Sequence, residues 1–356
     1  MPSVRQDWRP SPERGAARPS PKAYGGRGSP RACPRPEGRP TPSRRAAVNR
    51  FYATGERPDL FFFNIMKPFK RTYIEITNTC NLSCEFCPGT SRTTQFMKPE
   101  TFEKILVNLG QYSTHLYFHV LGEPLLHPEI AAFLDIAQKH KKLVNLVTNG
   151  TLISEKGYLI VGKPALRQVT FSLHSFVDAG KVASVNNYLG QIIDFAKKAS
   201  QSHIICLRLW DTDADAGGAV GAAMIRHVQD EFDLSYSLME RLQTSSGVNL
   251  GKNIFINKTK RFEWPDLSGP DFGETGFCLG LRQQITILAD GTVAPCCLDR
   301  NGDMVLGNIL SQKIEDIIGS KRAQRILNGF SRRKVAEILC KKCSYRLRFN
   351  LPSGLD

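Results

Sequence analysis

Apolar and polar residues follow two alternating patterns from Arg71 onward. Short runs rich in β-branched and aromatic residues predict strands, and segments with apolar residues at helical spacing predict helices. Pro99 and Pro128 lie near helix starts, where proline is well tolerated. Strands that alternate with helices predict an α/β fold with a parallel sheet, here a partial (β/α)6 TIM-like barrel. The predicted strands are 73–77, 116–120, 144–148, 168–173 and 204–209, and the predicted helices are 99–109, 129–140 and 185–200.

The pattern changes beyond about residue 250. Residues 284–288 and 292–294 form two apolar runs separated by Asp290-Gly291, a strong signal for a hairpin turn. We therefore expect a barrel over 66–250 and a small C-terminal α+β domain over 251–350.

The first 50 residues differ from the rest in composition. They hold ten prolines, and twelve Arg or Lys against three acidic residues. Such a segment buries too little apolar surface to offset its ordering entropy, so we predict a disordered arm. An organelle transit peptide is an alternative, although the prolines disfavour the amphipathic helix that it needs. The arm carries +9 of the net charge of +15. The remaining +6 does not require a nucleic acid partner.

Ten cysteines stand in clustered, unequal spacings along the chain. In a chain of this length the pattern favours metal binding in a reducing compartment over a disulfide framework. We therefore expect a cytoplasmic protein. No apolar run approaches the roughly 20 residues that cross a bilayer, so no membrane association is expected.

The most informative motif is the run that contains Cys80, Cys84 and Cys87, with Phe86 just before the last cysteine. Three thiolates can hold a 4Fe-4S cluster and leave one iron open to a non-protein ligand. The spacing resembles the radical S-adenosylmethionine (radical SAM) superfamily. A zinc site is the alternative, although zinc ligands usually come as two separated pairs. The resemblance implies that a reduced cluster cleaves SAM to a 5'-deoxyadenosyl radical, which abstracts hydrogen from a substrate carbon.

Further predicted site residues follow the other strands, where a barrel gathers its functional groups. Leu121-Gly122-Glu123-Pro124 is similar to the family's Gly-Glu-Pro element, which implies that Glu123 binds the amino group of SAM. A plain turn is the alternative for this triplet and for Asn149-Gly150. His174 is expected to be structural, and no catalytic residue is assigned. The residues expected to bind the cofactor are Phe86, Gly122, Glu123, Asn149, Ser172 and Arg208; for Arg208, pairing with a substrate carboxylate or a structural ion pair is also open.

Four cysteines in the last 80 residues form a second set: Cys278, Cys296, Cys340 and Cys343. Their spacing, with Gly291 five residues before Cys296, resembles the twitch domain, a shortened relative of SPASM domains. Four thiolates close a 4Fe-4S cluster completely, or equally a structural zinc site.

Three cysteines stand outside both sets. Cys297 is an alternative ligand, a buried thiol or a proton donor. Cys206 is expected in the core, and Cys33 lies in the arm.

Together these motifs predict an enzyme with two 4Fe-4S clusters and SAM. An auxiliary cluster without an open iron is suited to accept the electron left on the substrate. This predicts a two-electron oxidation, either dehydrogenation of a small molecule or modification of a peptide side chain. A low-potential donor such as flavodoxin or ferredoxin is the expected partner. The competing hypothesis is a non-catalytic binding module stabilised by zinc.

Overall fold

The computed structural model describes residues 68–178, 185–211 and 215–349. The predicted arm over 1–50 and Cys33 lie outside these residues.

The described strands form one sheet in the order β10-β9-β8-β1-β2-β3-β4-β5-β7-β6. From β8 to β7 every neighbouring pair is parallel, whereas β6, β9 and β10 pair antiparallel. The strands are β1 (Arg71–Ile74), β2 (His115–Phe118), β3 (Leu143–Thr148), β4 (Leu166–Ser172), β5 (Ile204–Asp211), β6 (Gly247–Gly251), β7 (Ile254–Lys260), β8 (Gln284–Ile287), β9 (Thr292–Ala294) and β10 (Gly307–Asn308).

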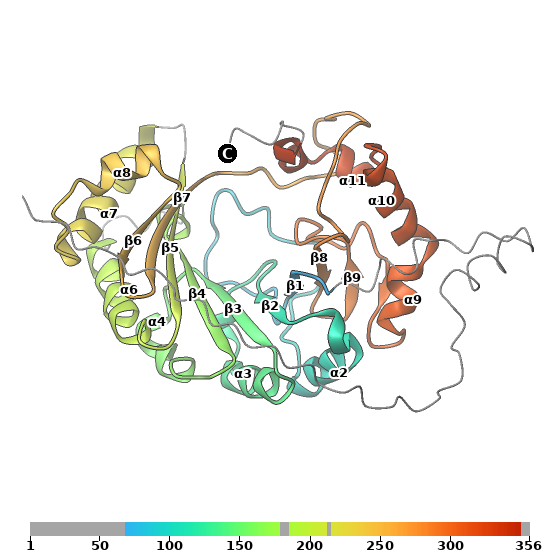
Figure 1. Ribbon diagram of the computed structural model, residues 1–356, viewed down its shortest axis with the longest axis horizontal. Coiled ribbons are helices and arrows are strands. Elements are labelled where there is room, and N and C mark those ends of the chain that lie inside the picture. The colour runs from blue at the N-terminus through green and yellow to red at the C-terminus, as the bar shows by residue number, and fades with distance from the viewer. Residues whose placement is uncertain (1–67, 179–184, 212–214, 350–356) are drawn as a thin grey trace, which may run out of the picture. The chain divides into compact units, whose positions relative to one another are not determined.

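Helices follow most of the parallel strands, as a βα fold requires. Figure 1 shows α2, α3, α4 and α6 along one side of strands β2 to β5. The α-helices are α2 (Pro99–Leu109), α3 (Ile130–Lys139), α4 (Ile153–Lys156), α5 (His174–Asp178), α6 (Val185–Ala199), α7 (Asp215–Glu231), α8 (Leu238–Thr244), α9 (Ile314–Gly319), α10 (Lys321–Ser331) and α11 (Ile338–Lys341). Short 3-10 helices lie at 110–112, 124–126, 157–159 and 344–349.

Alternate strand residues face the helices and the opposite side of the sheet. On β2, Leu116 and Phe118 are fully buried in the hydrophobic core. The Phe118 ring packs against Phe102 of α2, with ring centroids 5.5 Å apart. Tyr117, between them, lines a pocket on the other side of the sheet. One face of the sheet therefore builds the core, and the other is left for a site.

The six parallel strands β1 to β5 and β7 confirm the predicted α/β partial barrel. All five predicted strands and all three predicted helices are present; α2 has the predicted ends, and the other elements are displaced at one or both ends. β1 stops at Ile74 rather than Thr77, because Thr77 leaves the sheet: its Oγ1 donates a hydrogen bond to the Gln95 carbonyl (2.8 Å). Strands β6 and β7 were not predicted. β7 lies just beyond the predicted boundary at residue 250, yet it pairs with β5 over seven residues.

The C-terminal hairpin β8 and β9 extends the same sheet past β1. Contacts from the loop after the first cysteine motif also cross to this region. Arg92 donates to the Arg300 carbonyl (2.9 Å) and pairs with buried Glu75 at 2.7 Å. Thr90 donates to Asn301 at 3.0 Å. The division into domains at 66–250 and 251–350 stays a prediction.

Candidate cofactor pocket

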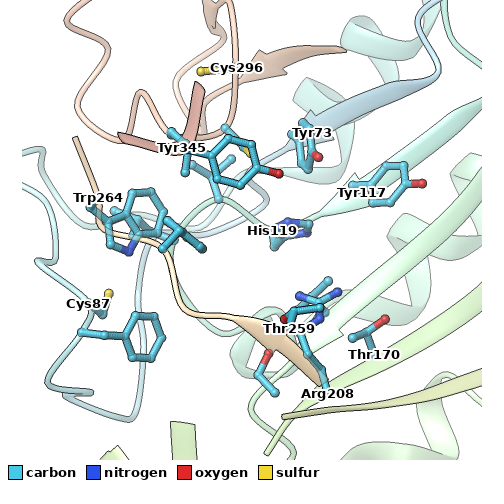
Figure 2. A pocket seen from close by; sticks show the side chains of 18 of the residues that line it. Tyr73, Cys87, Tyr117, His119, Thr170, Arg208, Thr259, Trp264, Cys296 and Tyr345 are labelled. Carbon is cyan, nitrogen blue, oxygen red and sulfur yellow. The ribbon is translucent and has the colours of Figure 1, made fainter. Parts of the chain in front are cut away.

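A pocket of about 590 Å³ lies over the polar face of the sheet. Figure 2 shows Cys87 and Cys296 at separate edges of this pocket, with Trp264 and Tyr345 between them. All the residues that the sequence predicted for cofactor and metal binding line it, namely Cys80, Cys84, Phe86, Cys87, Gly122, Glu123, Asn149, Ser172, Arg208, Cys278, Cys296, Cys340 and Cys343. The structure thus brings the predicted residues together, while their individual roles stay predictions.

The loop after β1 carries the first three cysteines. Its base is fixed by Asn78, which donates to the Thr93 carbonyl (3.0 Å) and accepts from the Gln95 amide (2.8 Å). A turn closes the tip, where the Cys87 amide donates to the Cys84 carbonyl at 3.0 Å. Three thiols on one anchored loop, facing a pocket with room for a small molecule, fit a cluster with one open corner.

No three His, Cys, Asp or Glu side chains converge on the position of a single metal ion within the described residues. In a 4Fe-4S cube each thiolate binds the iron at its own corner, so the thiolates stand wider apart than ligands of one ion.

Gly122 allows the loop after β2 to approach the first cysteine loop closely. Its φ is +77°, and a Cβ atom there would lie 2.5 Å from the Thr77 carbonyl oxygen and 2.9 Å from that of Thr79. The next amide, that of Glu123, donates to the Thr79 carbonyl at 2.8 Å. Only glycine combines this backbone angle with so close a contact.

The Glu123 carboxylate is almost completely buried and links the ends of β2 and β3. Oε1 accepts hydrogen bonds from the Leu125 amide (2.9 Å) and the Thr148 hydroxyl (2.7 Å). Oε2 accepts one from the Asn149 amide at 2.7 Å. Burial raises the pKa of Glu123, and these hydrogen bonds oppose that shift. A carboxylate has about four lone-pair positions, so one acceptor position on Oε2 is left for a ligand amine.

Asn149 connects the end of β3 to the first cysteine loop. Its Nδ2 donates to Asn81 Oδ1 at 2.9 Å and lies 3.9 Å from Cys80 Sγ. Its carbonyl accepts a hydrogen bond from buried Tyr188 at 2.7 Å. The chain bends at Gly150, where φ is +77°, as the alternative of a plain turn implied, and the bend also positions the Asn149 side chain beside the cysteines.

Ser172, the last residue of β4, lies opposite Arg208 on β5. Within the described residues the Arg208 guanidinium has no carboxylate partner. The alternative of a structural ion pair therefore finds no support among them. An unpaired guanidinium on a pocket wall is suited to a ligand carboxylate.

Aromatic side chains close the pocket beside the first cysteines. The Phe86 ring lies 4.1 Å from that of Trp210, measured between centroids. His174 stacks on Trp210 at 3.7 Å. Burial lowers the pKa of His174 to about 3, and the nearby Arg208 charge adds to this effect. A neutral, stacked imidazole agrees with the structural role expected for His174.

The second cysteine set converges at the other side of the pocket. Burial and the neighbouring thiols raise the pKa of Cys296 and Cys340 well above the ordinary value. Cys278 and Cys343 are among the neighbours that contribute to both shifts. Four mutually close, largely buried thiols fit a group that holds them as thiolates, such as a metal cluster.

Arg346 ties this region together. The side chain is only 1% exposed. Its guanidinium donates to the carbonyls of Cys340 (2.8 Å), Thr275 (2.8 Å), Phe272 (2.7 Å) and Gly273 (2.5 Å). It thereby joins the loop before Cys278 to the segment that follows Cys343. No sequence pattern singled out Arg346, because its role depends on carbonyls some 70 residues away.

Cys297 has a different partner from the adjacent Cys296. It is hydrogen-bonded to the buried Tyr73 hydroxyl, and burial raises its pKa to about 11. Cys206 is buried on β5, as expected.

His119 is the main pocket residue that sequence reasoning missed. Its ring contacts that of Tyr73 edge to face, at 5.0 Å between centroids. Its Nδ1 is buried and has no hydrogen-bond partner in the described part of the chain. Burial lowers the pKa of His119 to about 3, helped by Arg208 and Arg71. The alternation Tyr117-x-His119 was the available signal, but it becomes informative only once the inner face of β2 is known.

Two protein-family models match the two segments of the chain that carry the cysteine sets of this pocket. Residues 74–210 match the model of the radical SAM superfamily, and residues 278–344 match that of the SPASM iron-sulfur cluster-binding domain. The chain therefore carries a radical SAM domain followed by a SPASM domain. Radical SAM domains bind SAM on a 4Fe-4S cluster, and SPASM domains bind auxiliary iron-sulfur clusters.

Several curated radical SAM proteins are similar in sequence. The S-adenosyl-L-methionine-dependent 2-deoxy-scyllo-inosamine dehydrogenase of Niallia circulans is 20% identical over 288 residues, covering 78% of this chain and 94% of the relative. A tungsten-containing aldehyde ferredoxin oxidoreductase cofactor-modifying protein of Pyrococcus furiosus is 29% identical over 35% of this chain and 36% of the relative. The GTP 3',8-cyclase of Aquifex aeolicus is 29% identical over 38% of this chain and 46% of the cyclase. The chain thus spans a third to a half of the length of the last two relatives.

Two solved structures also align with this one. The complex of BtrN with AdoMet and 2-DOIA aligns with a TM-score of 0.48 at 18% identity, over 78% of this chain and 94% of BtrN. Streptococcus suis SuiB bound to S-adenosylmethionine aligns with a TM-score of 0.49 at 14% identity, over 78% of this chain and 75% of SuiB.

Proposed function

We propose that this radical SAM protein catalyses a two-electron oxidation of a substrate bound between two iron-sulfur clusters. The observation that carries this proposal is the pairing of a three-cysteine loop with a four-cysteine set on one pocket. When bound, SAM and the first cluster supply the radical that removes a hydrogen atom from a substrate carbon. A second cluster fully ligated by protein is suited to take up an electron.

Different residues of the chain would bind the two clusters and SAM. Cys80, Cys84 and Cys87 would hold the first cluster, and the second set would hold the auxiliary cluster. Oε2 of Glu123 retains an acceptor position for the SAM amino group. Arg208 would bind the SAM carboxylate, with Ser172 opposite it. Phe86 and Trp210 exclude water from the same corner, which protects radical chemistry from side reactions.

The floor of the pocket favours a hydroxylated substrate. Neutral polar side chains from three strands, β3, β4 and β7, line it: Asn145, Gln168, Thr170, Asn257 and Thr259. Barrel interiors are usually packed with branched apolar residues, so this polar floor calls for hydrogen-bonding ligand groups. Dehydrogenation of an alcohol is thus the favoured reaction, and similarity to the inosamine dehydrogenase over most of the chain supports it. Modification of a peptide side chain is the second candidate.

Anaerobic reconstitution tests the proposal against a zinc-stabilised binding module. The radical SAM enzyme should bind about eight irons and cleave SAM when reduced. Bound zinc without SAM cleavage would support the binding module instead.

Cysteine variants separate the two clusters. Cys84→Ala should abolish SAM cleavage, because the first cluster loses a ligand. Cys340→Ala should leave SAM cleavage but block formation of oxidised product, because the substrate electron has no acceptor. Cys206→Ala is the matched control, since this thiol is buried on β5 and belongs to neither cysteine set. Normal product formation by Cys340→Ala would refute the electron-accepting role.

The cellular setting is also a proposal. All nine cysteines of the described residues are free thiols, which agrees with a reducing compartment such as the cytoplasm. The described residues include no helix long and apolar enough to cross a membrane. A flavodoxin- or ferredoxin-type protein would reduce the first cluster.

A further inference from the structure

Positive charge is concentrated around the second cysteine set. Residues 313–348 carry eleven Lys or Arg against three Asp or Glu, a surplus of eight. Outside the N-terminal 50 residues the whole chain has a surplus of only six. The segment that contributes Cys340 and Cys343 therefore carries more than the whole surplus, and the rest of residues 51–356 has a net charge of −2.

Part of this charge is neutralised locally. Arg322 and Arg325 both pair with Glu337 at 2.8 Å. Lys342 pairs with Asp271 at 3.5 Å. These ion pairs are structural and leave little free charge at their positions.

Four exposed cations near the end of α10 have no carboxylate partner among the described residues: Arg282, Arg332, Arg333 and Lys334. We call them the basic patch. Arg282 reaches the Ser331 hydroxyl at the end of α10, which joins the two stretches of sequence.

The basic patch lies against the auxiliary cysteines. The guanidinium of Arg282 lies 5.4 Å from the centroid of the Phe277 ring, and that of Arg333 lies 5.8 Å from it. Phe277 directly precedes Cys278. The Gly276 amide donates to the Arg333 carbonyl at 2.9 Å, which fixes the patch to the same loop. One aromatic residue thus separates the patch from a candidate cluster ligand.

We propose that the basic patch is the docking site of an acidic one-electron carrier protein that exchanges electrons with the auxiliary cluster. This inference rests on the proposed function. Electron-transfer encounters bury little area and depend on charge for their rate. An unpaired patch beside a redox group meets both conditions. A nucleic acid would also be attracted by the charge, but its binding would not depend on a position next to the cluster.

The electron balance of the proposed oxidation requires such a carrier. The substrate loses one hydrogen atom to the SAM-derived radical, and then one proton and one electron. The proton passes to solvent and the electron to the auxiliary cluster. The oxidised carrier takes this electron and leaves reduced, so the cluster is ready for the next turnover.

Stopped-flow mixing of the reduced holoenzyme with an oxidised plant-type ferredoxin, an acidic iron-sulfur protein, tests the docking site. For the unmodified enzyme we expect an electron-exchange rate that falls with added salt. Arg332→Gln/Lys334→Gln should slow exchange about tenfold or more at low salt and weaken its salt dependence. Lys313→Gln/Lys321→Gln is the matched control. It removes the same amount of charge: Lys321 begins α10, about 16 Å along the helix from its other end, and Lys313 precedes α9.

SAM cleavage with a chemical reductant is measured for all three proteins. If none cleaves SAM, the proposed function itself fails. If all cleave SAM and the two double variants exchange electrons at the same rate, the docking site is wrong. Loss of duplex DNA binding by the patch variant, with unchanged electron exchange, would assign the patch to nucleic acid and overturn the proposal.

Discussion

At the scale of single residues, Arg346 is a buried charge without a carboxylate partner in the described part of the chain. Its hydrogen bonds all go to backbone carbonyls, and the charge is left uncompensated. An uncompensated buried charge costs several kcal/mol. The nearest groups able to balance it are the thiolates of Cys278 and Cys343, on whose pKa it acts. Arg346 is therefore expected to position the auxiliary cysteines and to raise the reduction potential of their cluster.

Replacing this charge should change the potential. Arg346→Gln should lower the midpoint potential of the auxiliary cluster by tens of millivolts, because the positive charge favours the reduced, more negative cluster. Arg346→Lys keeps the charge and should shift the potential less. Arg241→Gln, on α8, is the control. An EPR-monitored redox titration measures all four proteins, and equal potentials in the unmodified and Arg346→Gln enzymes would contradict this role.

Two histidines that line the pocket make stability depend on pH. The pKa values of His119 and His174 fall from 6.5 to about 3. Between these values the folded state binds fewer protons than the unfolded chain, so stability decreases as pH falls through this window. Each histidine contributes up to about 1.4 kcal/mol per pH unit. Denaturation at pH about 7 and about 5.5 should show a smaller loss for His119→Gln than for the unmodified protein; an equal loss would argue against a neutral, buried His119.

At the scale of elements, the two loops that follow β1 and β2 depend on each other. Gly122→Ala should destabilise the fold, because its Cβ would collide with the Thr77 carbonyl oxygen. Gly162→Ala is a matched control, with the same φ of +77° but nothing within 4 Å of the added Cβ. We expect Gly122→Ala to cost at least about 1 kcal/mol more in the free energy of unfolding. Equal costs in chemical denaturation would show that the close approach is not needed.

The sequence predicted those elements whose signals are local. Helix α2 was predicted at both ends, since Pro99 begins it and apolar spacing continues to Leu109. The cysteine sets were found because metal ligands recur at short, fixed spacings. β7 was missed because it carries Asn257, Lys258 and Thr259 where a strand pattern expects apolar residues, and Asn257 and Thr259 line the pocket. Arg346 and His119 were missed because their roles depend on contacts between distant segments.

At the scale of the whole molecule, one continuous sheet carries both cysteine sets. β1 leads into the first set and pairs with β8, whose hairpin leads into Cys296. Tyr73 on β1 is hydrogen-bonded to Cys297, so the barrel strand and the auxiliary site share a direct contact. A substrate in the pocket would lie between a radical source and an electron acceptor held by the same scaffold.

The central claim is that the two clusters differ, with one open to SAM and the other closed. Mössbauer spectroscopy of the ⁵⁷Fe-reconstituted enzyme, recorded with and without SAM, tests this most directly. With about eight irons bound, SAM should change the signal of about one iron, the open corner of the first cluster. A spectrum that SAM leaves unchanged, or one in which an iron of each cluster responds, would contradict the account.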